Sequence, residues 1–122
     1  PVLHAGVLSP DPYRRLEAIT ALGQVHDART PEVLRPLLES PSANDRKEVV
    51  FALGRIGGPA AERLLVAALG DADVDVRARA CLALGRAGSA DSIEPLTRVA
   101  RTDPDPRVRR RAEDAIIRIK AR

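Results

Sequence analysis

Three five-residue runs that recur at a fixed interval decide the fold of this chain: ALGQV at 21–25, ALGRI at 52–56 and ALGRA at 83–87. Each run begins 31 residues after the one before it. Periods of this length are typical of repeat architectures, in which each copy is one supersecondary unit. The sequence therefore predicts an array of similar units.

The residues before each glycine fall into the same columns in every unit. One column holds Asp11, Ser42 and Asp73, whose side-chain oxygens suit the first position of a helix. Apolar residues then recur at helical spacing up to the run, where the glycine is expected to end the helix in a left-handed conformation. A fourth copy follows 32 residues later, with Asp105 in the capping column.

A second, shorter helix is predicted after each glycine, at about 30–39, 59–69 and 90–100. Pro36 lies inside the first of these, where it removes a hydrogen bond and is expected to bend the helix. Neither helix of a pair can bury its apolar stripe alone. Stacking of at least three such pairs is therefore expected to form the core.

The stretches DADVDVRARACLALGRAG (71–88) and DPDPRVRRRAEDAI (103–116) resemble the short HEAT-like repeats first named for phycobilisome lyases. The resemblance covers nearly the whole chain. It implies an all-α fold, an α-solenoid in which antiparallel two-helix repeats form a right-handed superhelix. It also implies one domain, with a half repeat at 1–8, repeats at about 9–39, 40–70 and 71–101, and a C-terminal capping helix at 102–122. The family includes scaffolds, lyase subunits and accessory domains of enzymes, so the fold does not fix the function.

The two ends of the sequence differ in character. Val2, Leu3 and Val7 match second-helix positions 31 residues further on, which predicts an incomplete repeat with residues missing upstream. Such an apolar end could stack on a second copy and form a homodimer. At the other end Glu113 and Asp114 replace apolar columns, as a capping repeat requires. We expect the C-terminal part of a longer protein.

Composition excludes several classes of protein. The net charge is +3, but residues 98–122 carry nine Lys and Arg against four Asp and Glu, whereas residues 1–97 carry eleven against thirteen. The single cysteine excludes an intrachain disulfide. No apolar run approaches the roughly 18 residues of a membrane span, and no signal-peptide pattern is present. The sequence favours a cytoplasmic protein.

No motif predicts catalysis, a metal or a cofactor. The acidic run at 71–75 lacks the glycine and glutamate of a calcium loop. His4 and His26 have no partners at zinc-ligand spacing. Cys81 shares an apolar column with Ile19 and Val50, which predicts a buried thiol. The run GRIGG at 54–58 lacks the Lys-Ser/Thr of a phosphate loop and follows a helix.

The arginine column Arg15, Arg46, Arg77 and Arg109 is the strongest polar signal. It could form a stripe that binds anions. The resemblance implies instead that these positions form hydrogen-bonded ladders between repeats. We favour the ladder, because charges that recur regularly in solenoids usually serve the interface between neighbours.

A partner surface is predicted on the second helices, which usually line the concave face in HEAT-like arrays. Helix phase exposes eight polar candidates there, with charges of both signs: Glu32, Arg35, Glu39, Glu62, Arg63, Glu94, Arg98 and Arg101. The basic C-terminal helix offers candidate anion contacts at Arg107, Arg110 and Arg111. A solvated capping helix is the preferred interpretation of that cluster, since the near-absence of aromatic residues leaves no platform for base stacking.

We expect a non-catalytic module that binds or scaffolds another protein or another domain of its own chain. Two alternatives remain open. One is an accessory domain of a larger enzyme, of metallopeptidase or lyase type. The other is nucleic-acid binding through the basic C-terminal helix.

Overall fold

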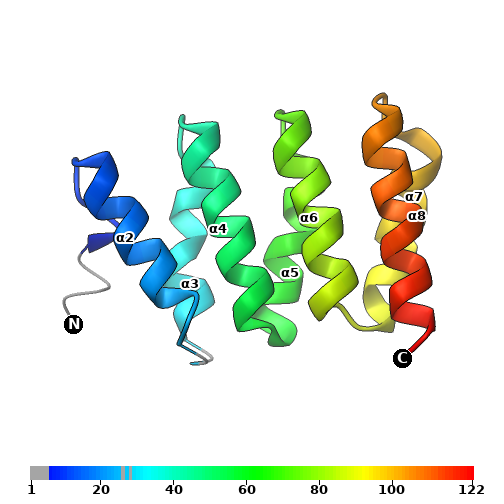
Figure 1. The fold of residues 1–122 in the computed structure, drawn as a ribbon, viewed down its shortest axis with the longest axis horizontal. Helices are drawn as coiled ribbons and strands as arrows, with labels where there is room; N and C mark the ends of the chain where they lie inside the picture. Colours follow the sequence, from blue (N-terminus) through cyan, green and yellow to red (C-terminus); the bar gives the residue numbers. More distant parts are fainter. Residues whose placement is uncertain (1–5, 26, 28) are drawn as a thin grey trace.

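The computed structural model describes residues 6–25, 27 and 29–122, and within them every regular element is a helix. The first helices of successive units stand side by side in one layer, and the second helices form another layer behind them (Figure 1). This arrangement is an α-solenoid. The first helices are α2 (Pro12–Leu22), α4 (Ala43–Ile56), α6 (Val74–Ala87) and α8 (Pro106–Lys120).

The second layer consists of shorter helices. Thr30–Leu34 (α3) passes directly into a 3₁₀ helix, Arg35–Glu39 (η1), so the break expected at Pro36 is confirmed. A proline cannot donate the α-helical hydrogen bond, which accounts for the tighter turn. The other members of this layer are α5 (Gly58–Ala68), η2 (Ala90–Ser92) and α7 (Ile93–Thr102).

The predicted capping column marks the start of every first helix. The Asp73 carboxylate accepts hydrogen bonds from the amides of Asp75 and Val76, and these bonds lower the pKa of Asp73. Asp11, Ser42 and Asp105 cap their own helices in the same way. A side-chain oxygen at this position satisfies amides that have no partner within the helix.

The glycines of the ALG runs do not stop α4 and α6, contrary to the prediction, although α2 does end before Gly23. Helices α4 and α6 continue for two residues beyond Gly54 and Gly85, and Gly23 caps α2 in a right-handed conformation, with φ −64°. Among the described residues, positive φ is confined to Gly57 (69°) and Gly58 (86°), where the chain turns from α4 into α5.

Close packing between repeats explains the glycines instead. A Cβ atom at Gly54 would lie 2.9 Å from the Cβ of Ala83, which is closer than two carbon atoms can approach. The glycine of one ALG run therefore lies against the alanine of the next. The same contact pairs Gly23 with Ala52 and Gly85 with Ala115.

The core lies between the two layers and continues from unit to unit. Leucines from both layers are fully buried, among them Leu34, Leu53, Leu65, Leu84 and Leu96. The predicted burial of Cys81 is confirmed, and burial raises the pKa of its thiol to about 12. Ile19 and Val50 are buried in the same column, whereas Glu113 of α8 is exposed.

Some sequence predictions fall on positions that the structure does not place. Val2, Leu3, His4 and His26 lie outside the described residues, while Val7 is buried. Every described helix is too short or too polar to traverse a lipid bilayer.

Candidate functional site

An arginine ladder joins each repeat to the next at the start of the first helices, as the sequence predicted. The Nε atom of each arginine lies within ion-pair distance of a carboxylate of the following repeat, and the side chains of all three pairs are at most 20% exposed. The pairs are Arg15–Asp45 at 3.1 Å, Arg46–Asp71 at 3.0 Å and Arg77–Asp103 at 2.8 Å.

The same guanidinium groups also bind backbone. Nη1 of Arg77 donates to the Asp71 carbonyl at 3.0 Å, and Nη1 of Arg46 donates to the Ser40 carbonyl at 2.6 Å. Arg109 makes the corresponding bond to the Asp103 carbonyl at 2.7 Å. The hydrogen bond to Asp103 raises the pKa of Arg77. These guanidinium groups already bind carboxylates and carbonyls of the protein itself, so the arginine column is not an open anion-binding stripe.

One acidic partner of the ladder comes from an unexpected position. Asp71 and Asp103 each lie two residues before a capping residue, but the second repeat has Ser40 there. Asp45, inside α4, takes the place of the missing carboxylate, and the Ser40 hydroxyl donates to it at 3.1 Å. The column alignment missed this exchange because the carboxylate has moved along the chain.

The second-helix candidates are spread over the back layer. Seven of the eight are exposed. Arg35 pairs with Glu32 at 3.2 Å, and Arg35 and Glu39 line a groove between η1 and α5. This η1–α5 groove has a volume of about 500 Å³, and its other lining residues are Leu38, Leu64, Ala67, Ala68, Gly70 and Asp71. Arg63, Glu94, Arg98 and Arg101 lie outside it.

Glu62 differs from the other seven candidates, and its expected exposure is wrong. Its carboxylate accepts a hydrogen bond from the Ser89 amide at 2.7 Å and further bonds from the hydroxyls of Ser89 and Ser92. Burial tends to raise the pKa of Glu62, but these bonds and the charge of Arg122 bring it below its ordinary value. Glu62 therefore ties α5 to the start of the next unit's second helix.

The basic C-terminal candidates Arg107, Arg110 and Arg111 all lie on α8 but have different surroundings. Arg107 forms an ion pair with the capping residue Asp105 at 3.0 Å, which lowers the pKa of that carboxyl. Arg110 and Arg111 are exposed, and Arg111 faces α6. Arg122 donates to three carbonyls at the end of α6, those of Gly85, Arg86 and Gly88.

A second groove lies on the opposite, first-helix layer, and we call it the α4–α6 groove. Its volume is about 480 Å³. Helix α4 supplies an aromatic wall, α6 supplies most of the remaining surface, and α8 closes one side. The lining residues are Phe51, Gly54, Asp75, Ala78, Arg79, Leu82, Ala83, Arg86 and Arg111.

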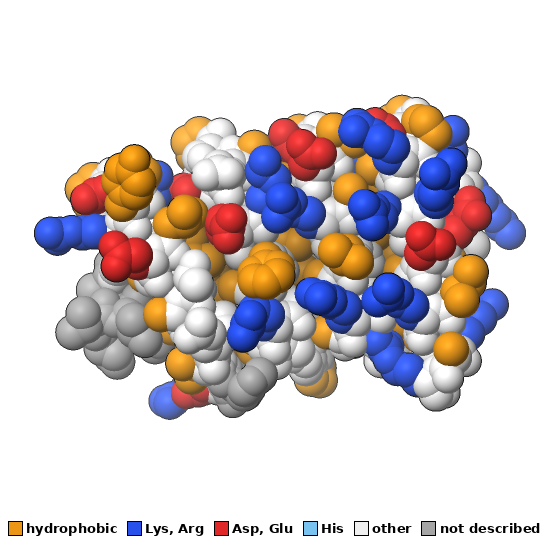
Figure 2. Space-filling model, in the orientation of Figure 1, with side chains coloured by type: hydrophobic (Ala, Val, Ile, Leu, Met, Phe, Trp, Pro, Cys, Tyr) orange, Lys and Arg blue, Asp and Glu red, His pale blue; other side chains and the backbone are white. Residues whose placement is uncertain are grey.

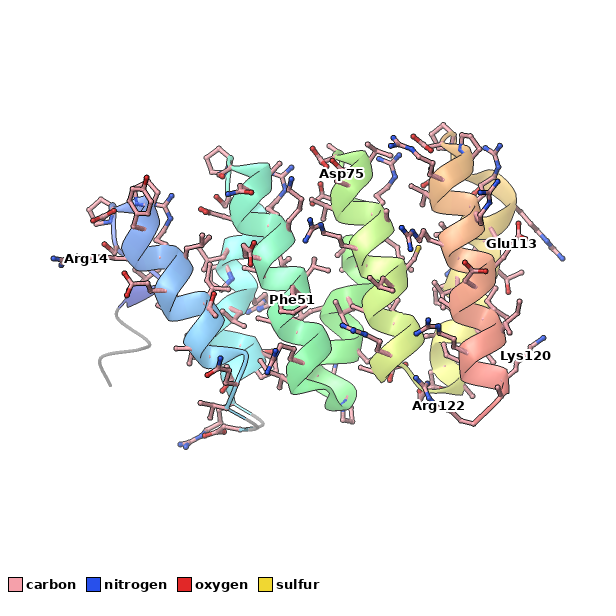
Figure 3. The ribbon with its side chains drawn as sticks, in the orientation of Figure 1. Arg14, Phe51, Asp75, Glu113, Lys120 and Arg122 are labelled. Carbon is pink, nitrogen blue, oxygen red and sulfur yellow. The ribbon has the colours of Figure 1, made fainter. Side chains whose placement is uncertain are left out.

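The centre of the α4–α6 groove is apolar. Phe51 is 44% exposed and Leu82 is 40% exposed. Phe51 projects from α4 on the same face of the molecule as Asp75 of α6 (Figure 3). The close contact of Gly54 with Ala83 lies beside these two side chains. Arg55 places its guanidinium carbon 5.8 Å from the centroid of the Phe51 ring.

The rim of the groove is basic. Arg79, Arg86 and Arg111 line the groove, and Asp75 is its single acidic lining residue. None of these three arginines forms an ion pair with any other residue that the structure describes. Lys and Arg side chains gather over α4, α6 and α8 around apolar side chains (Figure 2). The groove thus combines exposed apolar surface with an excess of positive charge.

The sequence analysis missed this groove because it placed the partner surface on the second helices. A usable signal was present. Arg55 and Arg86 follow Phe51 and Leu82 by four residues, so each of these two repeats places an arginine one helical turn from the apolar residue. No group of three or more His, Cys, Asp or Glu side chains in the described ranges could hold a metal ion.

Comparison with known proteins identifies the repeat. The family model for HEAT repeats matches residues 31–117, and no curated protein matches the chain. The structure is similar to that of human deoxyhypusine hydroxylase in complex with glycerol, with a TM-score of 0.88 and 27% identity. The chain is covered completely but spans only 44% of that enzyme.

An engineered protein is similar over 98% of this chain and 61% of its own, with a TM-score of 0.69 and 28% identity. The family match covers well over half of the sequence, and the paired helices in two layers agree with it. The chain belongs to the HEAT-repeat family.

Proposed function

We propose that this chain is a non-catalytic HEAT-repeat module that binds another protein, or another part of its own longer chain, through the α4–α6 groove. One observation carries the proposal. The groove exposes Phe51 and Leu82 beside three arginines that lack ion-pair partners in the described structure. Burying such apolar surface stabilises a complex, and contiguous exposed patches of this kind mark interaction sites.

The η1–α5 groove is similar in size but chemically weaker as a docking surface. Its two large apolar lining residues, Leu38 and Leu64, are only partly exposed. Arg35 is already paired with Glu32, and Asp71 is held by Arg46. The surface predicted from the second helices therefore stays a proposal for a second, more polar contact.

The similarity to deoxyhypusine hydroxylase supports a second candidate. Since this chain spans 44% of that enzyme, it could serve as a helical part of a larger enzyme. The partner surface would then bind another domain of the same chain. Nucleic-acid binding through α8 has less support, because Arg107 is paired with Asp105. We propose a cytoplasmic location, with which the single free cysteine is compatible.

A capture experiment tests the proposed function. The tagged chain, its Leu82→Asp variant and an Arg35→Ala, Arg63→Ala, Arg98→Ala triple variant are each incubated with lysate, and bound proteins are identified by mass spectrometry. Leu82→Asp places a charge in the apolar centre of the groove, so we expect it to lose partners that the triple variant retains. Partners that persist with Leu82→Asp, or that only the triple variant loses, would contradict binding in this groove.

A further inference from the structure

We infer that the occupant of the α4–α6 groove is an acidic polypeptide segment that inserts one apolar side chain between Phe51 and Leu82. This inference rests on the proposed function and specifies the chemistry of the partner. It follows from two features of the groove. The basic rim favours a ligand with negative charge, and the apolar centre favours a ligand with an apolar side chain.

The centre of the α4–α6 groove favours a ligand with an apolar side chain. Phe51 and Leu82 are each exposed by about two fifths, on adjacent helices, and Ala78 and Ala83 lie beside them. The small side chain of Ala78, which is partly exposed, leaves space that a larger side chain would fill. A leucine- or phenylalanine-sized side chain can bury both exposed faces at once, which is the role of a central anchor in an interface.

The rim of the groove favours a ligand that carries negative charge. Arg79, Arg86 and Arg111 line the groove, and Asp75 is the single acidic lining residue. Guanidinium groups bind carboxylates through two parallel hydrogen bonds, which gives geometric specificity as well as attraction. Arg55 beside the Phe51 ring adds a further positive charge at the edge. Acidic residues on both sides of the anchor would meet these groups.

A polypeptide fits this surface better than a nucleic acid. Non-specific binding of single strands relies on aromatic side chains that stack on successive bases. The groove has one aromatic residue, Phe51, and Arg55 lies over its ring. An apolar anchor flanked by carboxylates uses both the apolar centre and the arginines of the rim.

Selection from a random peptide library displayed on phage tests the charge preference. The full chain is compared with an Arg79→Glu, Arg86→Glu, Arg111→Glu variant, whose fold is checked by circular dichroism. We expect the original chain to select acidic peptides with one apolar residue and the variant to select basic ones. A matched Arg63→Glu, Arg98→Glu, Arg101→Glu variant should select the same peptides as the original chain. Equal selections by all three proteins, or no acidic enrichment, would overturn the inference.

Fluorescence anisotropy with one selected, synthesised peptide tests the anchor. Replacing its apolar residue by serine should weaken binding about tenfold, as loss of a central anchor does. Unchanged affinity would overturn the inference, and so would tighter binding of a labelled 20-nucleotide oligothymidine that the charge-reversed variant loses. If lysate capture depends on Leu82 while the selected peptides are uncharged, the inference of an acidic partner fails but the proposed function stands. If capture does not depend on Leu82, the proposed function itself fails.

Discussion

Arg77 connects two repeats with one guanidinium group. It reaches Asp103 of the next repeat and the carbonyl of Asp71 in its own, and its side chain is 14% exposed. The column of arginines and its role could be predicted from the sequence, because the spacing is regular. The acidic side of the ladder could not, since Asp45 and Asp71 occupy different positions in their repeats. Only the packed structure shows that both carboxylates pair with an arginine of the preceding repeat.

Removing one arginine of the ladder should destabilise the protein strongly. For Arg77→Ala we expect a loss of about 3 kcal/mol in the free energy of unfolding, because Asp103 would remain buried without its partner. Urea denaturation followed by circular dichroism measures this loss. The matched control is Arg35→Ala, whose pair with Glu32 is exposed and should contribute less than about 1 kcal/mol. Equal losses for the two variants would contradict a structural ladder.

Glu62 should make stability depend on pH. Its folded-state pKa lies below the ordinary 4.5, so its contribution is present above that value and is lost as the pH falls through the folded pKa. The original chain should therefore be more stable than Glu62→Gln at pH 7, and the difference should shrink progressively below pH 4.5. Denaturant titrations across this range measure the difference. A difference that is constant with pH would count against the Glu62 contact.

At the scale of helices, the starts of helices could be predicted from the sequence better than their ends, because capping residues mark the starts. Asp73 and its equivalents gave the starts of the first helices, and Pro36 gave the change from α3 to η1. The helix ends were harder, because a glycine near the end of an apolar pattern has two explanations. It can stop a helix or allow a close approach, and only the neighbouring helix decides between them. Here Gly54 lies against Ala83.

The contact between Gly54 and Ala83 predicts that substitutions at these two positions have coupled effects on stability. Gly54→Ala should destabilise the protein by about 1–3 kcal/mol through overpacking, although alanine favours a helix over glycine by about 1 kcal/mol. Adding Ala83→Gly removes the opposing methyl group, so the double variant should return close to the original stability. Thermal unfolding of the single and double variants measures the coupling. Additive effects of the two substitutions would show that the helices do not meet here.

At the scale of the whole molecule, stacking separates two faces with different chemistry. The second-helix face carries polar residues of both signs, as the sequence predicted for that layer. The first-helix face carries exposed Phe51 and Leu82 with arginines around them. Sequence columns placed Arg55 and Arg86 one turn after Phe51 and Leu82, but they could not show that this apolar column is open. They show which residues repeat, but the path of the array decides which apolar column is covered by a neighbour and which stays open.

The most direct test of binding in the α4–α6 groove is a titration of isotope-labelled protein with the selected acidic peptide, followed by amide chemical shifts. We predict that the largest changes fall on α4, α6 and α8, around Phe51, Leu82 and Arg86, while η1 and α5 change little. Changes concentrated at Arg35, Glu39 and Leu64 would place the partner on the second-helix face and contradict this account.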